Sequence, residues 1–175
     1  MAKISDVFDM LDEWAPFSTA LEFDNAGLMV GNMDDMASRV AVALDLTDDT
    51  LEAAKEQGCD LIVTHHPAIF TPLKALDTHS LVYRAAASGI GIISAHTNLD
   101  AADGGVNDVL AYTLAVADAQ PLIGTGEPPM ARIGHIEPLS DRVLAEWCKK
   151  ALGVGAVKYV PTDRIIHKEI GRAHV

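Results

Sequence analysis

The chain has 175 residues, of which 49% are apolar and 22% are charged, and this composition excludes a disordered tail. Its 13 basic residues against 25 acidic ones give a formal net charge of -12. That balance argues against nucleic acid and anionic membranes as partners, because both bind to clustered Lys and Arg.

The expected elements alternate between helix and strand along the chain. An amphipathic helix from Ser5 or Asp6 to about Glu13 comes first, and Pro16 ends it. Further helices are expected at 47–58, 80–87, 105–116 and 140–152, and strands at 28–30, 39–44, 61–63, 90–94, 132–136 and 157–160. Buried apolar strands separated by helices predict an α/β fold with a mixed, largely parallel sheet flanked by helices.

The hydrophobic periodicity of the sequence is lost after Ala119. Residues 124–129 are rich in Gly and Pro, show no periodicity and read as a linker or loop. We therefore expect a first α/β lobe over 1–120 and the start of a second α/β lobe over 121–168.

The cysteines and the start of the chain bear on location. Cys59 and Cys148 lie far apart and indicate reduced thiols. The first residues lack the apolar region of a signal peptide, and no apolar run approaches the ~20 residues of a membrane span. These features predict a cytoplasmic protein.

Polar residues follow three of the predicted strands. Asp45 follows the first, His65 and His66 follow the second, and the stretch from His96 to Asp100 follows the third. Ligands of α/β sheets bind beyond the carboxyl ends of the strands, and neighbouring strands lie about 5 Å apart. We therefore expect His65, His66, His96 and Asp100 to converge.

Imidazole and carboxylate groups together are a donor set for Zn, Mn, Fe, Co or Ni. Adjacent histidines after a strand point in different directions, so the pattern favours two neighbouring metal ions, with Asp100 bridging or completing them. Two ions about 3.5–4 Å apart activate a water and polarise a carbonyl, imine or phosphoryl group. A mononuclear site of His65, His96 and Asp100 is the alternative.

Two other carboxylates are interpreted as helix caps rather than ligands. Asp45 precedes the helix expected from Thr47, and Asp103 precedes the helix expected from Gly105. No function is assigned to the isolated histidines His79, His135 and His167.

Three longer motifs carry a family resemblance. They are Thr64-His65-His66-Pro67 with Ile69-Phe70, Ala95-His96-Thr97-Asn98-Leu99-Asp100-Ala101-Ala102, and Gly104-Gly105-Val106-Asn107-Asp108. Together they resemble the Nif-three-like dinuclear metal-centre family, whose members are often described as GTP cyclohydrolase I type 2 homologues. The stretch Asp24-Asn25-Ala26-Gly27-Leu28 also resembles that family, which commonly has Trp in place of Phe23.

The resemblance covers about residues 5–165, and it implies a fold, an assembly and a set of cofactors. It implies a two-lobed α/β protein with intertwined mixed sheets, assembled as a ring-shaped homohexamer around an internal cavity. It also implies two divalent transition metal ions as cofactors, with His65, His66 and Asp100 as ligands and His96 as a further ligand or close neighbour.

The C-terminal part departs from the family pattern. The family places a further His and Glu, four residues apart, near its C-terminus, and no such pair follows Pro161 here. Residues 169–175, Glu-Ile-Gly-Arg-Ala-His-Val, are what one frame of a common sequencing adapter encodes. We therefore expect a non-native tail over 169–175 and an incomplete second lobe. A native reading frame that ends at Val175 in the source DNA would contradict this expectation.

Two functions stay open at this point. One is a metal-dependent hydrolase acting on GTP as a GTP cyclohydrolase I type 2, in which an activated water attacks the imidazole ring carbon of the purine. The other is a non-catalytic, metal-binding hexameric scaffold or regulator. No residue outside the ligand set stands out as a general acid, so the sequence assigns no catalytic residue.

Overall fold

The structure is a computed structural model that describes residues 2–122 and 128–172. The chain divides into two compact units, Met1–Ala102 and Asp103–Val175. The helix expected at 105–116 therefore belongs to the second unit. Residues 124–127 of the expected linker and 173–175 of the expected tail lie outside the described residues.

The first unit contains a four-stranded mixed sheet. Its strands are β1 (Gly27–Val30), β2 (Val40–Ala43), β3 (Leu61–Thr64) and β4 (Gly91–Ser94), in the order β1-β4-β3-β2. Strands β2, β3 and β4 are parallel, and β1 runs antiparallel to β4. The predicted mixed, largely parallel sheet is confirmed.

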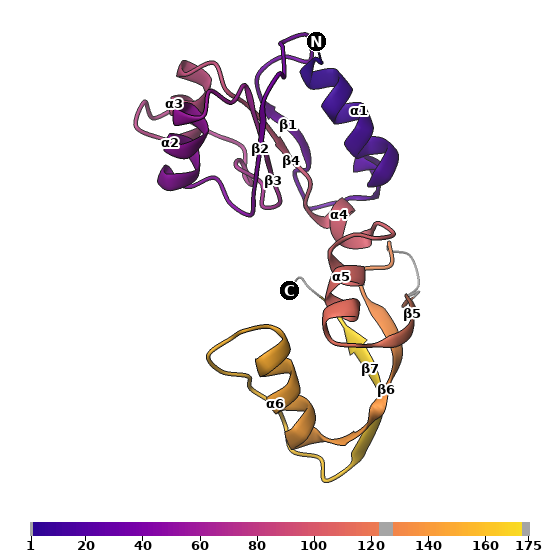
Figure 1. Ribbon diagram of the computed structural model, residues 1–175. Coiled ribbons are helices and arrows are strands. Elements are labelled where there is room, and N and C mark those ends of the chain that lie inside the picture. Colours follow the sequence, from indigo (N-terminus) through magenta and orange to yellow (C-terminus); the bar gives the residue numbers. More distant parts are fainter. Residues whose placement is uncertain (1, 123–127, 173–175) are drawn as a thin grey trace. The chain divides into compact units, whose positions relative to one another are not determined.

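Helices cover both faces of this sheet, with α1 (Ile4–Trp14) on one side and α2 (Asp48–Glu56) and α3 (Leu81–Ala87) on the other (Figure 1). Successive strand residues point to opposite faces, so neighbouring residues of β3 serve different cores. Leu61 packs with α1, and Ile62 packs with α2 and α3. Two apolar layers thus hold β3 and β4 in the middle of the unit.

The ends of the helices follow local chemistry. Thr47 caps α2 and Ser80 caps α3, each accepting a backbone N–H with its hydroxyl, and both helices begin where the sequence pattern placed them. Helix α1 begins earlier than predicted, at Ile4. Asp6 is not its capping residue but lies in its first turn, where the carboxylate accepts the N–H of Lys3 at 2.8 Å.

Strand β2 is not the buried strand that its apolar run suggested. It lies at the edge of the sheet, and its residues alternate between exposed and partly exposed. The Val42 side chain is 82% exposed. Local hydrophobicity alone does not separate a central strand from an edge strand.

The second unit contains a three-stranded antiparallel sheet and the helices α5 and α6. Its elements are α5 (Val106–Thr113), β5 (Ala117–Pro121), β6 (Arg132–Ser140), α6 (Asp141–Ala151) and β7 (Ile165–Gly171), and the strand order is β5-β6-β7. The strand expected at 157–160 is wrong, because those residues lie beside α6, where Val157 and Val160 line a cavity. Strand β7 includes 169–171 of the expected tail.

A buried arginine of the second unit is paired with a partly exposed carboxylate. Arg132 is 1% exposed and donates to both carboxylate oxygens of Asp108. It also donates to the carbonyl of Pro129 at 3.0 Å. Asp103 does not cap α5 as expected, because Gly105 is the N-cap residue and no side chain caps the helix. The Asp103 carboxylate instead lies 4.0 Å from the Arg132 side chain.

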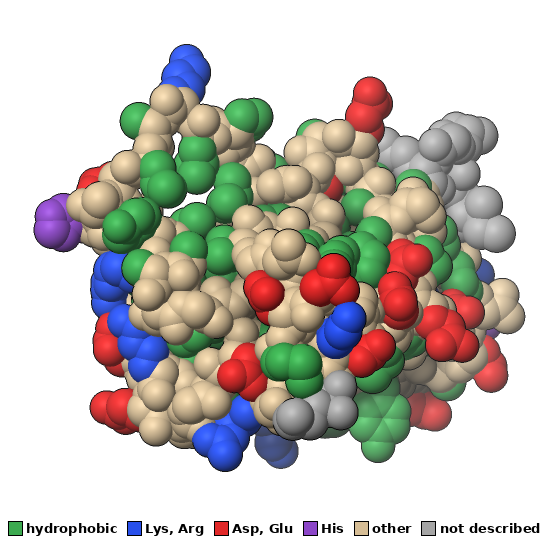
Figure 2. Space-filling model, turned by 90° about the horizontal axis from the view of Figure 1, so that it is seen from above, with side chains coloured by type: hydrophobic (Ala, Val, Ile, Leu, Met, Phe, Trp, Pro, Cys, Tyr) green, Lys and Arg blue, Asp and Glu red, His purple; other side chains and the backbone are tan. Residues whose placement is uncertain are grey.

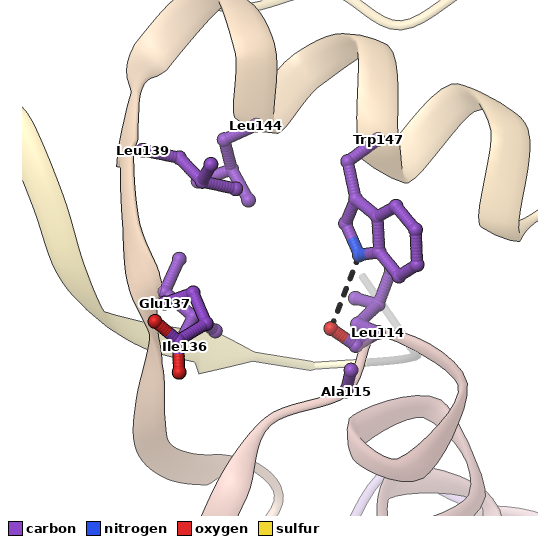
Figure 3. Close-up of a pocket in the computed structure, with 7 residues that line it drawn as sticks. All are labelled: Leu114, Ala115, Ile136, Glu137, Leu139, Leu144 and Trp147. Carbon is purple, nitrogen blue, oxygen red and sulfur yellow. Dashed lines mark hydrogen bonds between the residues drawn. The ribbon is translucent and has the colours of Figure 1, made fainter.

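A small apolar cavity lies between α6 and β6 in the second unit (Figure 3). Its volume is about 260 Å³. Trp147 of α6 closes one side and donates its indole N–H to the carbonyl of Leu114 at 3.2 Å. Leu139 and Leu144 face the opening from the strand and the helix.

The surface reflects the acidic composition. On the face drawn in Figure 2, Asp and Glu side chains are spread among apolar and basic ones instead of forming one continuous patch. Among the described residues, no helix combines the length and the apolar character that a bilayer crossing requires.

Candidate metal centre

The parallel strands bring the predicted histidines to one edge of the sheet. Thr64 at the end of β3 pairs with Ser94 at the end of β4, so the residues that follow both strands emerge side by side. The ladder continues beyond the strands, because Ala95 donates to the carbonyl of Thr64 at 2.9 Å and His65 donates to that of Ala43 at 3.1 Å. The positions of the histidines are therefore set by backbone pairing.

His65, His66 and His96 form one cluster. One ring nitrogen of each lies within 4.8 Å of those of the other two. The cluster spans a gradient of exposure, because the side chain of His96 is 3% exposed, that of His65 14% and that of His66 41%. The centre thus has a buried side at His96 and a solvent side at His66.

Hydrogen bonds determine which nitrogen of each ring bears the proton. Nδ1 of His65 lies 2.9 Å from the carbonyl of Ala95. Nδ1 of His66 lies 2.7 Å from the carboxylate of Asp45, and Nδ1 of His96 lies 2.7 Å from the carboxylate of Asp24. Carbonyls and ionised carboxylates only accept, so each Nδ1 donates. In the neutral ring the lone pair then resides on Nε2. A donor from Nδ1 to carboxylate or carbonyl is the usual support of a metal-binding imidazole.

Asp24 is the functional residue that sequence reasoning missed. Its second oxygen accepts from the backbone N–H of Thr97 at 3.0 Å and from the Thr97 hydroxyl. Burial raises the pKa of Asp24, but the hydrogen bonds from Thr97 and His96 outweigh it and hold the pKa below its ordinary value. The carboxylate therefore stays charged beside His96. Its place in the Asp24–Leu28 motif was the one signal for it.

Asp45 is not the helix cap that was expected. Thr47 caps α2, and the Asp45 carboxylate instead accepts from His66. Its side chain is 50% exposed, so this support for His66 is open to water. Asp45 and Asp24 thus play the same part on opposite sides of the cluster.

Asp100 lies next to the cluster but outside the group of three. Its side chain is fully buried, and Oδ1 lies 3.8 Å from Nε2 of His65. Burial lowers the pKa of His65 more than the negative charge of Asp100 raises it, so the net shift is downward. A lowered pKa keeps His65 neutral, which is the form that binds metals. Asp100 as a ligand stays a prediction.

A short helix that was not predicted, α4 (Thr97–Ala101), presents His96 and Asp100 together. Residues four apart lie on one helical face, and Asp100 donates its N–H to the carbonyl of His96 at 3.1 Å. The Asn98 side chain anchors the turn. Its Oδ1 accepts from the backbone N–H of His96 at 2.9 Å, and its Nδ2 donates to the Ala15 carbonyl at 2.7 Å.

The donor set fits a divalent transition metal. Three imidazoles, with a buried carboxylate next to one of them, match the ligands of Zn, Fe, Mn, Co and Ni. His79, to which no function was assigned, lies in an exposed segment and is not part of the cluster.

An apolar cavity of about 510 Å³ reaches the centre at His65. Its walls are side chains of α1 and of the edge strand β2, among them Met10, Trp14 and Val42. These walls offer few groups that would recognise a charged ligand. A polar ligand is therefore expected on the side of His66.

Comparison with known proteins decides the family. The family model described as Duf34/NIF3 (NGG1p interacting factor 3) matches residues 2–171. The chain belongs to the NIF3 family. The resemblance of the His65-His66 and His96-to-Asp100 motifs is thereby confirmed at the level of the family.

Curated NIF3 relatives carry a name that refers to an activity. A protein of Lactococcus lactis named "GTP cyclohydrolase 1 type 2 homolog" is 36% identical over 174 residues, which are 97% of this chain and 67% of that protein. A protein of Clostridium perfringens with the same name is 32% identical over 96% of this chain and 67% of its own length. The chain thus spans about two thirds of these relatives.

Solved structures of NIF3-like proteins share the fold. Staphylococcus aureus protein SA1388 superposes with a TM-score of 0.87 at 24% identity, over 95% of this chain and 70% of that one. Reduced HcgD from Methanocaldococcus jannaschii gives 0.73 at 28% identity, over 85% and 60%. The α/β architecture described above is therefore a NIF3-like fold.

Proposed function

We propose that this NIF3-family chain binds divalent transition metal ions through His65, His66, His96 and Asp100. The observation that carries the proposal is the shared orientation of the three imidazoles, each of which donates from Nδ1 to an oxygen acceptor. That arrangement favours metal binding through Nε2. Two ions are proposed, with Asp100 beside His65 as the bridging or completing carboxylate.

The reaction proposed for this centre is hydrolysis of a purine nucleotide, with GTP as the substrate, as the name of the relatives suggests. When bound, the metal ions supply an activated water and polarise the group under attack. The chain itself orients the imidazoles: Asp24 fixes His96, Asp45 fixes His66, and the Ala95 carbonyl fixes His65. The attacked atom is the imidazole ring carbon of the purine.

Assembly and location are part of the same proposal. We propose a cytoplasmic homohexamer, as the family resemblance implies, with the metal centres facing its interior. In that setting the exposed His66 edge is the side from which a small polar substrate reaches the centre.

Elemental analysis of the purified chain, combined with a screen for nucleotide hydrolysis, tests the proposal. We expect bound transition metal, and we expect His65→Ala and Asp100→Ala to lower the metal content while His79→Ala leaves it unchanged. Equal losses in all three variants would show damage to the fold and contradict the assignment. Bound metal without hydrolysis of GTP would favour the scaffold or regulator and reject the enzyme.

A further inference from the structure

The four phenylalanines of the chain fall into two classes, and all of them lie in the first unit. Phe8 and Phe17 stack on each other, with ring centroids 4.4 Å apart, and pack against the core next to α1. Phe23 and Phe70 are 61% and 51% exposed. A single exposed aromatic ring is ordinary on a protein surface, so exposure alone assigns nothing to either residue.

The location of Phe70 distinguishes it from an ordinary surface residue. Its ring centroid lies 6.5 Å from that of His96, and the two ring planes meet at 83°. This is within the contact range of aromatic pairs. A ligand that reaches His96 in the centre therefore comes within reach of the Phe70 ring as well.

Phe70 is also held in position by its predecessor. The carbonyl of Ile69 accepts from the Asn25 side-chain amide at 2.6 Å, and the Ile69 N–H lies 3.3 Å from the sulfur of Met29. Residues 70–79 are all exposed. The backbone is thus fixed up to the residue before Phe70, and Phe70 is the first residue of the exposed segment.

Taken together, these contacts describe an aromatic ring that lies against His96 of the metal centre and has about half of its surface in water. Stacking on such a ring favours flat π systems and tolerates differences in their substituents. An aliphatic or sugar-phosphate ligand would gain much less from it.

We propose that Phe70 is a specificity-determining residue that stacks on the planar heteroaromatic ring of the substrate at the His65, His66 and His96 centre. The inference rests on the proposed function, and it adds that the ring of the substrate, rather than its phosphate, is recognised by this residue. Phe70 takes no part in the hydrolytic step.

Calorimetric titration of the zinc-loaded chain tests the inference with two probes that differ by the base alone, guanosine 5′-monophosphate and ribose 5-phosphate. The wild-type chain should bind the first more tightly. Phe70→Ala should weaken it roughly 10- to 100-fold, the range of base stacking, and leave ribose 5-phosphate unchanged. Phe70→Tyr should restore the affinity, and Phe70→Leu should not, because leucine keeps apolar bulk and loses the ring.

Leu76→Ala is the matched control, because Leu76 lies in the same exposed segment and is 56% exposed. It should change neither affinity. Full affinity in Phe70→Leu, or equal binding of both probes by the wild type, would overturn the role of the ring. Zinc content measured on the same samples separates the two proposals. A wild-type chain that takes up no zinc overturns both, whereas ring-dependent binding without hydrolysis overturns the enzyme alone.

Discussion

Each unit of the molecule pairs a carboxylate with a buried side chain, and the two pairs differ in what that buried side chain can do. In the first unit Asp24 accepts from His96, whose side chain is 3% exposed. In the second unit Asp108 accepts from Arg132, whose side chain is 1% exposed. In both cases hydrogen bonds hold the pKa of the carboxylate below its ordinary value.

The difference lies in the chemistry of the partner. A neutral imidazole that donates from Nδ1 still carries a lone pair on Nε2, so orienting it creates a metal ligand. A guanidinium has five donors and no acceptor, so orienting it supplies no lone pair for a metal ion. A carboxylate that orients a buried side chain therefore supports a candidate metal centre in one unit and forms an ion pair in the other.

Removing the carboxylate of the ion pair should have the largest effect on stability. Asp108→Ala leaves the buried Arg132 without its main charged partner, and loss of one member of a buried pair costs about 3 kcal/mol. A third of the Asp108 side chain is exposed, which places the cost at the lower end of the usual range. Urea unfolding, followed by Trp147 fluorescence in a Trp14→Phe background, measures it.

Asp103→Ala is the control for that experiment. The Asp103 carboxylate lies 4.0 Å from Arg132 with its side chain 98% exposed, so its loss should lower the free energy of unfolding by less than about 0.5 kcal/mol. Equal effects of the two substitutions would show that Asp108 has no special role. Metal content should stay at the wild-type level in both variants.

Removing the charge behind His96 should have the next largest effect, on metal affinity. In Asp24→Asn one side-chain oxygen is replaced by an amide that faces the two donors of Thr97, and His96 loses its anionic partner. Loss of such a supporting group typically costs 10–100-fold in metal affinity. Competition with a zinc chelator at fixed pH measures the loss.

Asp45→Asn provides the comparison on the solvent side of the centre. The side chains of Asp45 and His66 are 50% and 41% exposed, so water and salt already weaken their interaction. We expect a smaller loss of affinity than for Asp24→Asn, less than about 10-fold, and one that shrinks further at high salt. A larger effect at Asp45 would reverse the assignment of buried and exposed sides.

The convergence of His65, His66 and His96 was predictable because it follows from a regular feature. Parallel strands end at one edge of a sheet, and residues directly after them share that edge. The starts of the helices at Thr47 and Ser80 were predictable for a similar reason, since a hydroxyl at the start of a helix acts on backbone only three residues away.

The supporting carboxylates were not predictable from the same rules. Asp24 lies 72 residues from His96 in a loop without periodicity, so no local pattern connects them. Asp45 stands close to a helix start, and the local interpretation as a cap competed with the tertiary contact that prevails. The edge strand β5 contains Ala, Asp, Gln and Pro, residues of low strand propensity, and forms through pairing with β6.

The smallest expected effect is the pH dependence of the stability that the Asp108–Arg132 pair contributes. The hydrogen bond from Arg132, opposed by partial burial, lowers the pKa of Asp108 below 3.8. A carboxylate with a depressed folded-state pKa contributes stability that is present above the unfolded pKa and is lost as the pH falls through the folded value. The difference in unfolding free energy between wild type and Asp108→Asn should therefore be constant from neutral pH down to about pH 4 and should narrow below it. Urea unfolding with Trp147 as the probe measures this difference, and a gap that widens on acidification would mean that Arg132 does not stabilise the charged form of Asp108.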